Sequence, residues 1–556
     1  MEGIHSRSVR FLMSRSSLAS SAILVASWAT AATGLGQAGS QELPAGHSSH
    51  GAVFNEGPRQ RANLIPGCGA VHFPVRGLVD TAQQFFDQGV GQLHGFWYFE
   101  AERSFRQVLL LQPDCAMGYW GMAMANVENE ARAHGLIREA WERREHGSER
   151  ERRYIEALAR FHGAAGKDFA DDWKPPASRS KEDEQRRKRF VEDLEELIYE
   201  HPEDIEAKAL LANHLWLNMR AGISIPSRQA NQALLDQVFA SVPNHPAHHY
   251  RVHLWDSRET AHRVTDSAAA IGHSAPGIAH MWHMAGHIWA KLDRHDDAAW
   301  QQEASARVDH AHMMRDRVMP DQIHNYAHNN EWLCRSLRHV GRVRDSISLA
   351  RNMIELPRHP VWNALGDGYN SSNYGLRRLR ETLETFEAWD ATLELAETMY
   401  LQREDDPEQD HGWPEAKARA HHARQRVDGL HAALEEAREA LRDARNSRAE
   451  SIDDIESEAL AEGKSNADVD EAVAAISKST TATVRDVLKL EREIEGLLWW
   501  CEGRKEDALE RLADVGHDRT HLARLHLEAG DADKALDLAR KAASAKGISQ
   551  PLANLC

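Results

Sequence analysis

Pairs of histidines four residues apart recur in the middle of this chain. His249 and His253 form the first pair, and His283 and His287 form the second, 34 residues later. A spacing of four places two side chains on one face of a helix, one turn apart. Neutral imidazole is a ligand for zinc, copper, iron and nickel. The pattern therefore predicts helices that gather imidazoles around a transition metal.

A third pair follows the second after a longer spacer. The chain contains 33 histidines, and 15 of them lie between residues 245 and 339. A single pair is too small for a stable zinc or copper site, which usually takes three or four ligands. We therefore expect pairs on neighbouring helices to act together on one wall. The predicted metal ligands are His249, His253, His283, His287, His324 and His328.

Acidic side chains accompany two of the pairs. Asp256 lies three residues after His253, and Glu331 lies three residues after His328. Each carboxylate could complete a coordination shell or orient an imidazole from behind. If the metal activates water or oxygen, both carboxylates are candidates for catalytic proton transfer. The HExxH motif of zinc peptidases is missing, which disfavours that chemistry.

The alternative interpretation is that the histidines pack between helices and bond to the backbone or to aromatic rings. It is the better one for any single histidine, whereas two pairs at one repeat period favour a metal or polar-ligand site. We expect Trp255, Trp282 and Trp289 to be core residues. We expect His421 and His422, further along, to be solvated.

The surrounding sequence predicts pairs of antiparallel helices. Gly89 is followed by Ala101 after twelve residues, by Phe105 after four more and by Pro113 after eight more. Small residues allow two helices to approach, the phenyl ring fills the space between them, and the proline begins the next turn. These are the intervals of the tetratricopeptide (TPR) repeat, whose period is about 34 residues. We therefore expect an all-α, TPR-like helical solenoid.

Composition divides the chain into five parts. We expect a signal peptide at residues 1–31, an extended leader at 32–80 and the TPR-like solenoid at 81–402. Residues 414–498 are rich in Ala, Glu, Arg and Lys with apolar residues every three or four positions, which predicts an inserted antiparallel coiled-coil hairpin. Residues 499–556 predict further TPR-like repeats.

The first residues are typical of an export signal. Arg7, Arg10 and Arg15 form a positively charged region before the largely apolar run at residues 18–28, and we expect cleavage after Ala31 or Ala38. The protein is therefore expected to be exported, to the periplasm or outside the cell. No later stretch reaches the ~20 apolar residues that a membrane span needs. An uncleaved membrane anchor is the alternative.

Charge and cysteine content exclude several classes of function. The net charge of −18 argues against nucleic acid or an anionic membrane surface as a partner. The five cysteines contain no CxxC pair, which excludes a cysteine zinc knuckle and provides no disulfide framework.

The chain resembles a group of exported bacterial TPR-like proteins whose activity is unassigned. The resemblance rests on the early segments FFDQGV, FEAERSFRQ and DCAMGYWG and on the later motifs HYRVH, HMAGHI and HN. Some members continue into a peroxiredoxin- or thioredoxin-like domain, for which this sequence shows no pattern. The resemblance implies functional roles for His249, His253, His283, His287 and His328.

Two functions remain open at this point. In the first, the concave groove of the solenoid holds a transition metal, either Zn, Cu or Fe, for catalysis, storage or delivery. In the second, the protein is a non-enzymatic TPR scaffold whose groove takes a protein or peptide and whose histidines are structural.

Overall fold

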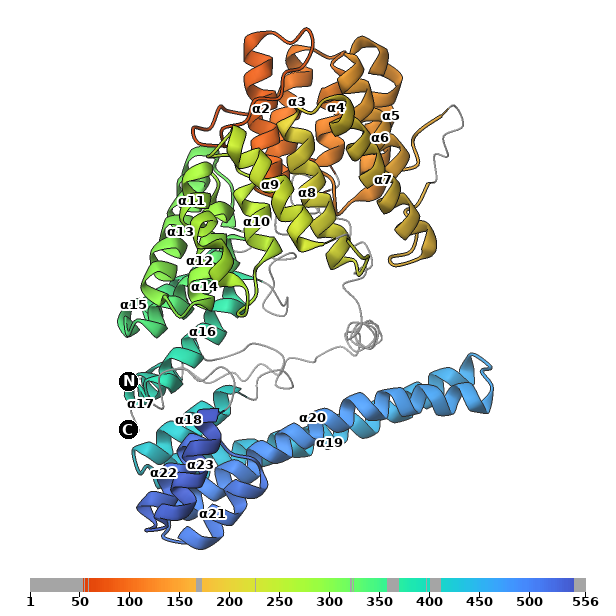
Figure 1. Ribbon diagram of the computed structural model, residues 1–556. Coiled ribbons are helices and arrows are strands. Elements are labelled where there is room, and N and C mark those ends of the chain that lie inside the picture. Colours follow the sequence, from red (N-terminus) through yellow and green to blue (C-terminus); the bar gives the residue numbers. More distant parts are fainter. Residues whose placement is uncertain are drawn as a thin grey trace, which may run out of the picture. The chain divides into compact units, whose positions relative to one another are not determined.

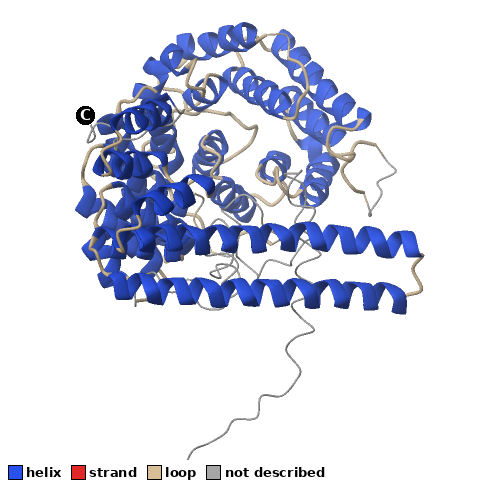
Figure 2. Cartoon of the chain, turned by 90° about the horizontal axis from the view of Figure 1, so that it is seen from below, coloured by secondary structure: helices blue, strands red, loops and turns tan. Residues whose placement is uncertain are grey.

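A computed structural model describes residues 54–544, apart from residues 55, 59, 167–172, 226, 321, 322, 324, 358–369, 397 and 401–411. These residues form 22 α-helices and no β-strand (Figure 2), which confirms the predicted all-α fold. No helix in this part of the chain is both long enough and apolar enough to cross a membrane. The expected signal peptide lies outside the described residues.

The chain forms two compact units. The first, called the solenoid unit, extends from Glu42 to Gln402, and the second, called the C-terminal unit, extends from Arg403 to Ala542.

The solenoid unit consists of consecutive antiparallel helix pairs (Figure 1). The helices of its first half are α2 (Asp80–His94), α3 (Tyr98–Leu111), α4 (Ala116–Met124), α5 (Glu130–Arg143), α6 (Glu149–Phe161), α7 (Lys181–Glu200), α8 (Ile205–Arg220) and α9 (Arg228–Ser241). Those of its second half are α10 (His248–Leu254), α11 (Thr265–Ser274), α12 (Ala279–Lys291), α13 (His295–Asp316), α14 (Tyr326–His339), α15 (Val343–Glu355), α16 (Ser371–Thr385) and α17 (Trp389–Leu395). Two short 3₁₀ helices are η1 (Arg144–His146) and η2 (Ala261–Val264).

The first helices of successive pairs pack side by side. Contacts join α8 with α10, α10 with α12, α12 with α14, and α14 with α16. This is the arrangement of a TPR-like solenoid, as the repeat period predicts. Residues at equivalent positions of α10, α12 and α14 are therefore brought to neighbouring places.

Glycines, among them the predicted Gly89, allow neighbouring helices to approach. A Cβ atom on Gly89 of α2 would lie 2.7 Å from the ring of Phe105 on α3, and one on Gly121 of α4 would lie 2.4 Å from the same ring. Phe105 therefore fills the space between three helices. In the later pair, a Cβ atom on Gly286 of α12 would lie 2.2 Å from Nε2 of Gln302 on α13. Any larger residue at position 286 would push the amide of Gln302 away from α12.

The first helix pair returns to the middle of the solenoid unit. His312 of α13 places Nε2 3.5 Å from Oε1 of Glu100 on α3, and its ring meets Trp97 edge to face. The segment before α2 follows the same junction, where the backbone oxygen of Gly67 accepts a hydrogen bond from the amide of Gly277 (2.8 Å). The unit thus curves back on itself, as the arc of helices in Figure 2 shows.

A long helical hairpin dominates the C-terminal unit. Its helices are α19 (Val427–Ala461) and α20 (Asn466–Cys501), drawn in blue in Figure 1. Ser465 begins α20 with a capping box, because its hydroxyl accepts a hydrogen bond from the amide of Asp468 and the Asp468 carboxylate accepts one from the amide of Ser465. The other helices are α18 (Gly412–Ala423), α21 (Lys505–Asp514), α22 (Arg519–Glu528) and α23 (Ala532–Ser544).

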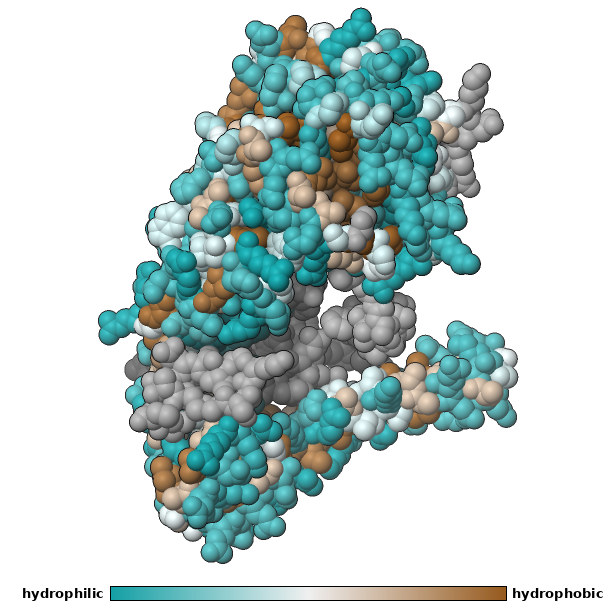
Figure 3. All heavy atoms as spheres, in the orientation of Figure 1, coloured by the Kyte–Doolittle hydropathy of each residue, from teal (hydrophilic) through white to brown (hydrophobic). Residues whose placement is uncertain are grey.

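The two ends of the hairpin differ in packing. At its base, Leu430, Ile494 and Leu497 are buried in one hydrophobic cluster with residues of α18, α21 and α22. Between residues 445 and 482, a stretch described in full, Ala459 and Val469 are the only buried residues. In Figure 3 the visible face of the molecule is mostly hydrophilic, with scattered hydrophobic patches, some of them on the hairpin. The base of the hairpin is therefore part of a core, whereas its outer half is largely solvated.

Candidate metal centre

Six histidines from three neighbouring helices meet inside the solenoid unit. They form two groups of three, and within each group the available ligand atoms lie within 4.8 Å of one another. The first group, called triad A, contains His249, His253 and His280. The second group, called triad B, contains His283, His287 and His328. Helix α10 supplies two of these side chains, α12 supplies three and α14 supplies one.

The structure brings five of the six predicted ligands together. His324, the remaining one, lies outside the described residues. His280 was not predicted, although it precedes His283 by three residues and His287 by seven, which places all three on one face of α12. The pattern HxxHxxxH could have identified it, whereas a search for spacings of four alone misses it.

The triads lie in the interior rather than along an open groove. His249 is 0% exposed and His283 is 1% exposed. The ring of Trp332 stacks on His287, with centroids 4.2 Å apart. The side chain of His328 is 31% exposed, so triad B keeps one edge open to solvent. The expected concave display is closed because the first helix pair folds back toward α10 and α12.

Hydrogen bonds fix the proton position on His283. Its Nδ1 lies 2.8 Å from Oε1 of Gln302, and Nε2 of Gln302 donates a hydrogen bond to the backbone oxygen of His283 (3.1 Å). The second bond orients the amide, so its oxygen accepts a hydrogen bond from Nδ1 of His283. The Nε2 atom of His283 therefore carries a lone pair. The close approach of α12 and α13 at Gly286 makes this pair of bonds possible.

His287 presents a second lone pair at the same place. Its Nδ1 lies 3.8 Å from Oδ2 of Asp256, and Asp256 is also paired with Lys291. An ionised carboxylate accepts hydrogen bonds and cannot donate them, so it favours the proton on Nδ1. The Nε2 atoms of His287 and His283 are 2.7 Å apart. Two nitrogen lone pairs at this distance repel each other unless a proton lies between them or both bind the same metal ion.

His328 also has a carboxylate behind it. Its Nδ1 lies 3.2 Å from Oε1 of Glu331, which is paired with Arg378 through its other oxygen. Burial opposes the charge on Glu331, but the hydrogen bond from His328 and the guanidinium of Arg378 outweigh it and lower the pKa of Glu331 to about 2. Asp256 and Glu331, the candidates for catalysis, thus lie behind the imidazoles, where they orient the rings.

Burial favours the neutral form of His287 and of His253. It lowers the pKa of His287, although the nearby Asp256 carboxylate acts in the opposite direction. Burial and the neighbouring His249 hold the pKa of His253 well below its ordinary range. Neutral imidazole is the form that binds metal ions.

Triad A has a similar arrangement of donors. Nδ1 of His249 donates a hydrogen bond to the backbone oxygen of His94 (2.6 Å), which leaves the lone pair of His249 on Nε2. The Nε2 atom of His253 is buried and has no hydrogen-bond partner among the described residues. Nδ1 of His280 lies 3.0 Å from the side-chain amide of Asn325. The rings of His249 and His253 lie 4.6 Å apart, and those of His249 and His280 lie 4.9 Å apart.

A third buried group, called the closed group, contains His94, Glu206 and His245. Oε2 of Glu206 lies 2.6 Å from Nε2 of His94, and Oε1 lies 3.1 Å from Nε2 of His245. The other nitrogen of His94 lies 2.7 Å from the hydroxyl of Tyr250, and that of His245 accepts a hydrogen bond from the amide of Ala247 (3.0 Å). Every ring nitrogen has a partner, so this group is a structural network.

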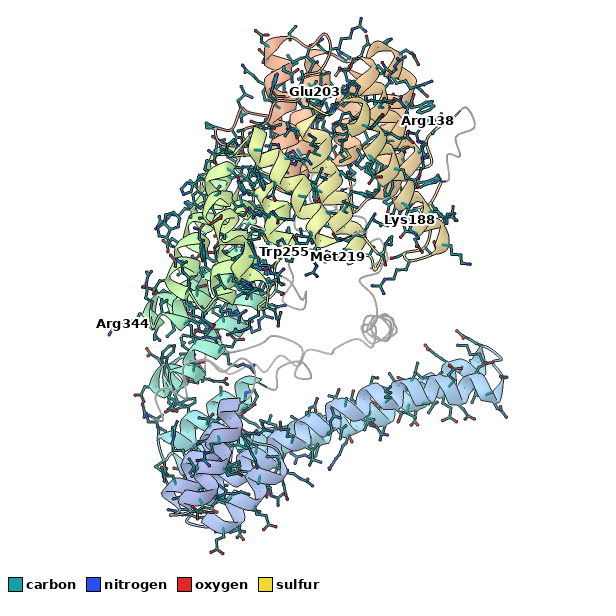
Figure 4. The ribbon with its side chains drawn as sticks, viewed as in Figure 1. Arg138, Lys188, Glu203, Met219, Trp255 and Arg344 are labelled. Atoms are coloured by element: carbon teal, nitrogen blue, oxygen red, sulfur yellow. The ribbon has the colours of Figure 1, made fainter. Side chains whose placement is uncertain are left out.

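Tryptophans and cysteines near the triads belong to the core. Trp255, Trp282 and Trp289 are 5%, 8% and 7% exposed, as expected for core residues. Figure 4 places Trp255 beside Met219, with which it shares a hydrophobic cluster. Burial raises the pKa of the Cys68 thiol to about 12, which disfavours the thiolate that a metal would need.

Comparisons with known proteins identify no family for this chain. No protein-family model matches the sequence, and no curated protein matches it. A chain from the structure of Naa15/Naa10 bound to HypK-THB aligns over 85% of this chain and 70% of its own length, with 12% identity and a TM-score of 0.27. The TPR domain of P58(IPK) aligns over 85% of this chain and 96% of its own length, with 10% identity and a TM-score of 0.20. These values transfer no function to this chain.

Proposed function

We propose that this protein is an exported TPR-like protein that binds a transition metal ion at triad B, with triad A as an adjoining imidazole site. The observation that carries the proposal is the 2.7 Å separation of the Nε2 atoms of His283 and His287. Gln302 accepts the Nδ1 proton of His283, and the Asp256 carboxylate, 3.8 Å from Nδ1 of His287, favours the proton of His287 on that nitrogen, so the Nε2 lone pairs of the two rings face each other.

The donor set of triad B suits a zinc, copper or iron ion. Three imidazoles are the protein ligands of one common type of catalytic zinc site, which leaves a fourth position for water or substrate. Each imidazole has an amide or carboxylate behind it, and such partners orient the ring and increase its basicity. The exposed edge of His328 offers an entry path. A bound ion of this kind supplies Lewis acidity for activating water or oxygen.

Asp256 and Glu331 act as positioning residues in this proposal. Lys291 pairs with Asp256 and Arg378 pairs with Glu331, which favours the ionised form of each carboxylate. Burial would raise the pKa of Asp256, but His287 and Lys291 together lower it below its ordinary value. An ionised carboxylate keeps the proton of its imidazole on Nδ1 and leaves Nε2 for the metal.

Elemental analysis of the full chain, purified without a histidine tag, tests this proposal directly. We expect at least one equivalent of zinc, copper or iron after reconstitution, and we expect His287→Asn to lose the triad B equivalent while keeping its helical circular dichroism. His262→Asn is the matched control, because His262 is exposed. A wild-type protein that binds no metal under any of these conditions would favour the alternative, a scaffold that binds a protein or peptide and whose histidines are structural.

A further inference from the structure

Triad A has the same arrangement as triad B, one helix pair earlier in the chain. In each triad, one helix supplies two imidazoles one turn apart, and the first helix of the next pair supplies the third. His249 and His253 of α10 precede His283 and His287 of α12 by 34 residues. The two histidine pairs therefore occupy equivalent positions of successive repeats.

The third imidazoles of the two triads are equivalent as well. His280 of α12 and His328 of α14 are 48 residues apart. The left-handed residues that follow these two helices, Asp293 (φ 57°) and Gly341 (φ 76°), are separated by the same 48 residues. His280 and His328 thus lie at the same position relative to the ends of their helices. The solenoid unit therefore contains one three-imidazole site twice.

The rings of triad A are spaced as those of triad B are. The ring centroids of triad A are 4.6, 4.9 and 6.3 Å apart, and those of triad B are 4.4, 4.8 and 6.0 Å apart. Imidazoles that share an ion at an M–N distance of ~2.0–2.1 Å have ring centroids on the order of 5 Å apart. All three rings of triad A contact one another, so they can converge on one ion.

The ring nitrogens of triad A are also arranged as metal ligands require. Metal-binding histidines usually donate the other ring N–H to a backbone oxygen or a carboxylate, as His249 does to the backbone oxygen of His94. Nε2 of His253 is buried and has no hydrogen-bond partner among the described residues, although buried polar groups nearly always have one. The side-chain amide of Asn325, 3.0 Å from Nδ1 of His280, can present its oxygen there and leave the lone pair of His280 on Nε2.

Aromatic rings enclose triad A. The ring of Phe96, which follows α2, has its centroid 4.3 Å from that of His249 and stacks on His253 at 5.6 Å. The ring of Trp216 on α8 also stacks on His253, at 4.4 Å. Phe96 has a φ of 54°, a left-handed conformation that is unusual for a bulky residue. Strained residues of this kind are often found at functional sites.

We propose that triad A binds a second transition-metal ion, enclosed by the first helix pair. The inference rests on the proposed function for the class of ion, since both triads offer three imidazoles. Triad B has an edge open to solvent at His328, whereas the equivalent His280 is buried. The ion of triad A can leave only when the turn that carries Phe96 moves away from α10. It should therefore be released much more slowly than the ion of triad B.

The test is the release of zinc from the full, tag-free chain to a chromogenic chelator. Wild type should release two equivalents, one quickly and one slowly. His253→Asn should lose the slow equivalent, and His287→Asn should lose the fast one. Phe96→Gly should keep both equivalents but release both quickly, because glycine adopts a positive φ without strain and removes the covering ring. Gln425→Gly is the matched control, because Gln425 also has a positive φ (53°) but lies in the C-terminal unit. It should leave both rates unchanged.

Equal zinc content in wild type and His253→Asn would overturn the second ion. Release of both equivalents at one rate, or a slow rate that Phe96→Gly leaves unchanged, would overturn its enclosure. A wild type with only a slow equivalent, lost in His253→Asn and kept in His287→Asn, would support triad A and reject the proposed site at triad B. Helical circular dichroism checks the fold of each variant, and His280→Gln takes the place of His253→Asn if that variant does not fold.

Discussion

Triad B and the closed group are both histidine clusters of the solenoid unit, and they differ in where the carboxylate lies. In the closed group, Glu206 lies between His94 and His245 and receives both imidazoles, at 2.6 and 3.1 Å. In triad B, the carboxylates lie on the outside, so the Nε2 atoms of His283 and His287 face each other. A central carboxylate occupies the imidazole nitrogens with structural hydrogen bonds. Carboxylates behind the rings leave the Nε2 lone pairs of the imidazoles available to a ligand.

Removing the central carboxylate should have the largest effect on stability. Glu206→Gln keeps the shape of the side chain but directs an N–H group at an imidazole and removes a buried charge. We expect a loss of about 3–5 kcal/mol in the free energy of unfolding, which is typical of breaking a buried ion pair. Denaturant unfolding should give the same loss with and without a chelator. A loss that appears only when metal is present would place a metal in the closed group as well.

For substitutions of the histidines in the triads, by contrast, the loss of stability should depend on whether metal or a chelator is present. His287→Ala should abolish the metal-dependent part of the stability, about 2.7 kcal/mol when free metal is a hundredfold above its dissociation constant. His253→Ala should do the same if triads A and B bind cooperatively, and should lose one separate equivalent if they do not. Thermal melts with metal and with chelator measure both. The control His262→Ala should keep the full difference. If both triad variants keep the metal content and the melting temperatures of wild type, these histidines are core residues and not metal ligands.

The pH dependence of the junction between α3 and α13 should contrast with that of the triads. Burial opposes the charge of His312, but Asp316 and Glu100 outweigh it and raise the pKa of His312 to about 9. A raised pKa favours the folded state below the unfolded pKa near 6.5, and this contribution is lost as the pH rises through about 9.

The expected contribution of this junction is on the order of 2 kcal/mol, because one pKa unit corresponds to about 1.4 kcal/mol and the buried pair is strongly coupled. Unfolding with a chelator present at pH 6, 8 and 10 measures it for wild type and for His312→Gln. Wild type should lose stability over this range, and the variant should lose less. Metal binding to neutral imidazoles changes in the opposite sense, since it weakens as the pH falls. Parallel profiles for the two proteins would show that His312 carries no charge at the junction.

The sequence predicted which histidines share a helix, but it did not predict the contacts between residues far apart in the chain. The four-residue spacing placed His249 and His253 on one helix, and the 34-residue period placed His283 and His287 on a neighbour. Helix α10 is only seven residues long, because backbone turns precede His248 and follow Leu254.

The closed group depends on the return of the first helix pair to the middle of the unit. His94 and Glu206 are 112 residues apart in the chain, and no local period relates them. Gln302 was equally hidden, because its role depends on the approach of α12 and α13 at Gly286. The burial of His422, which is 5% exposed rather than solvated as expected, could not be inferred either, since the heptad pattern of the neighbouring hairpin resembles that of a solvated arm.

The smallest effect should come from shortening the hairpin. The hairpin predicted at residues 414–498 cannot be removed as a whole, because Leu430 and Ile494 belong to the core of the C-terminal unit. The outer half is different, because Arg448 faces Thr481 across the two helices at 3.2 Å and few side chains beyond them are buried. Deleting residues 449–480 and joining the ends with a short Gly/Ser turn should shift the thermal melt by no more than a few degrees, with metal content unchanged. A large loss of stability would show that the outer arm contributes to the fold, and a loss of metal without a loss of stability would connect the arm to a metal site.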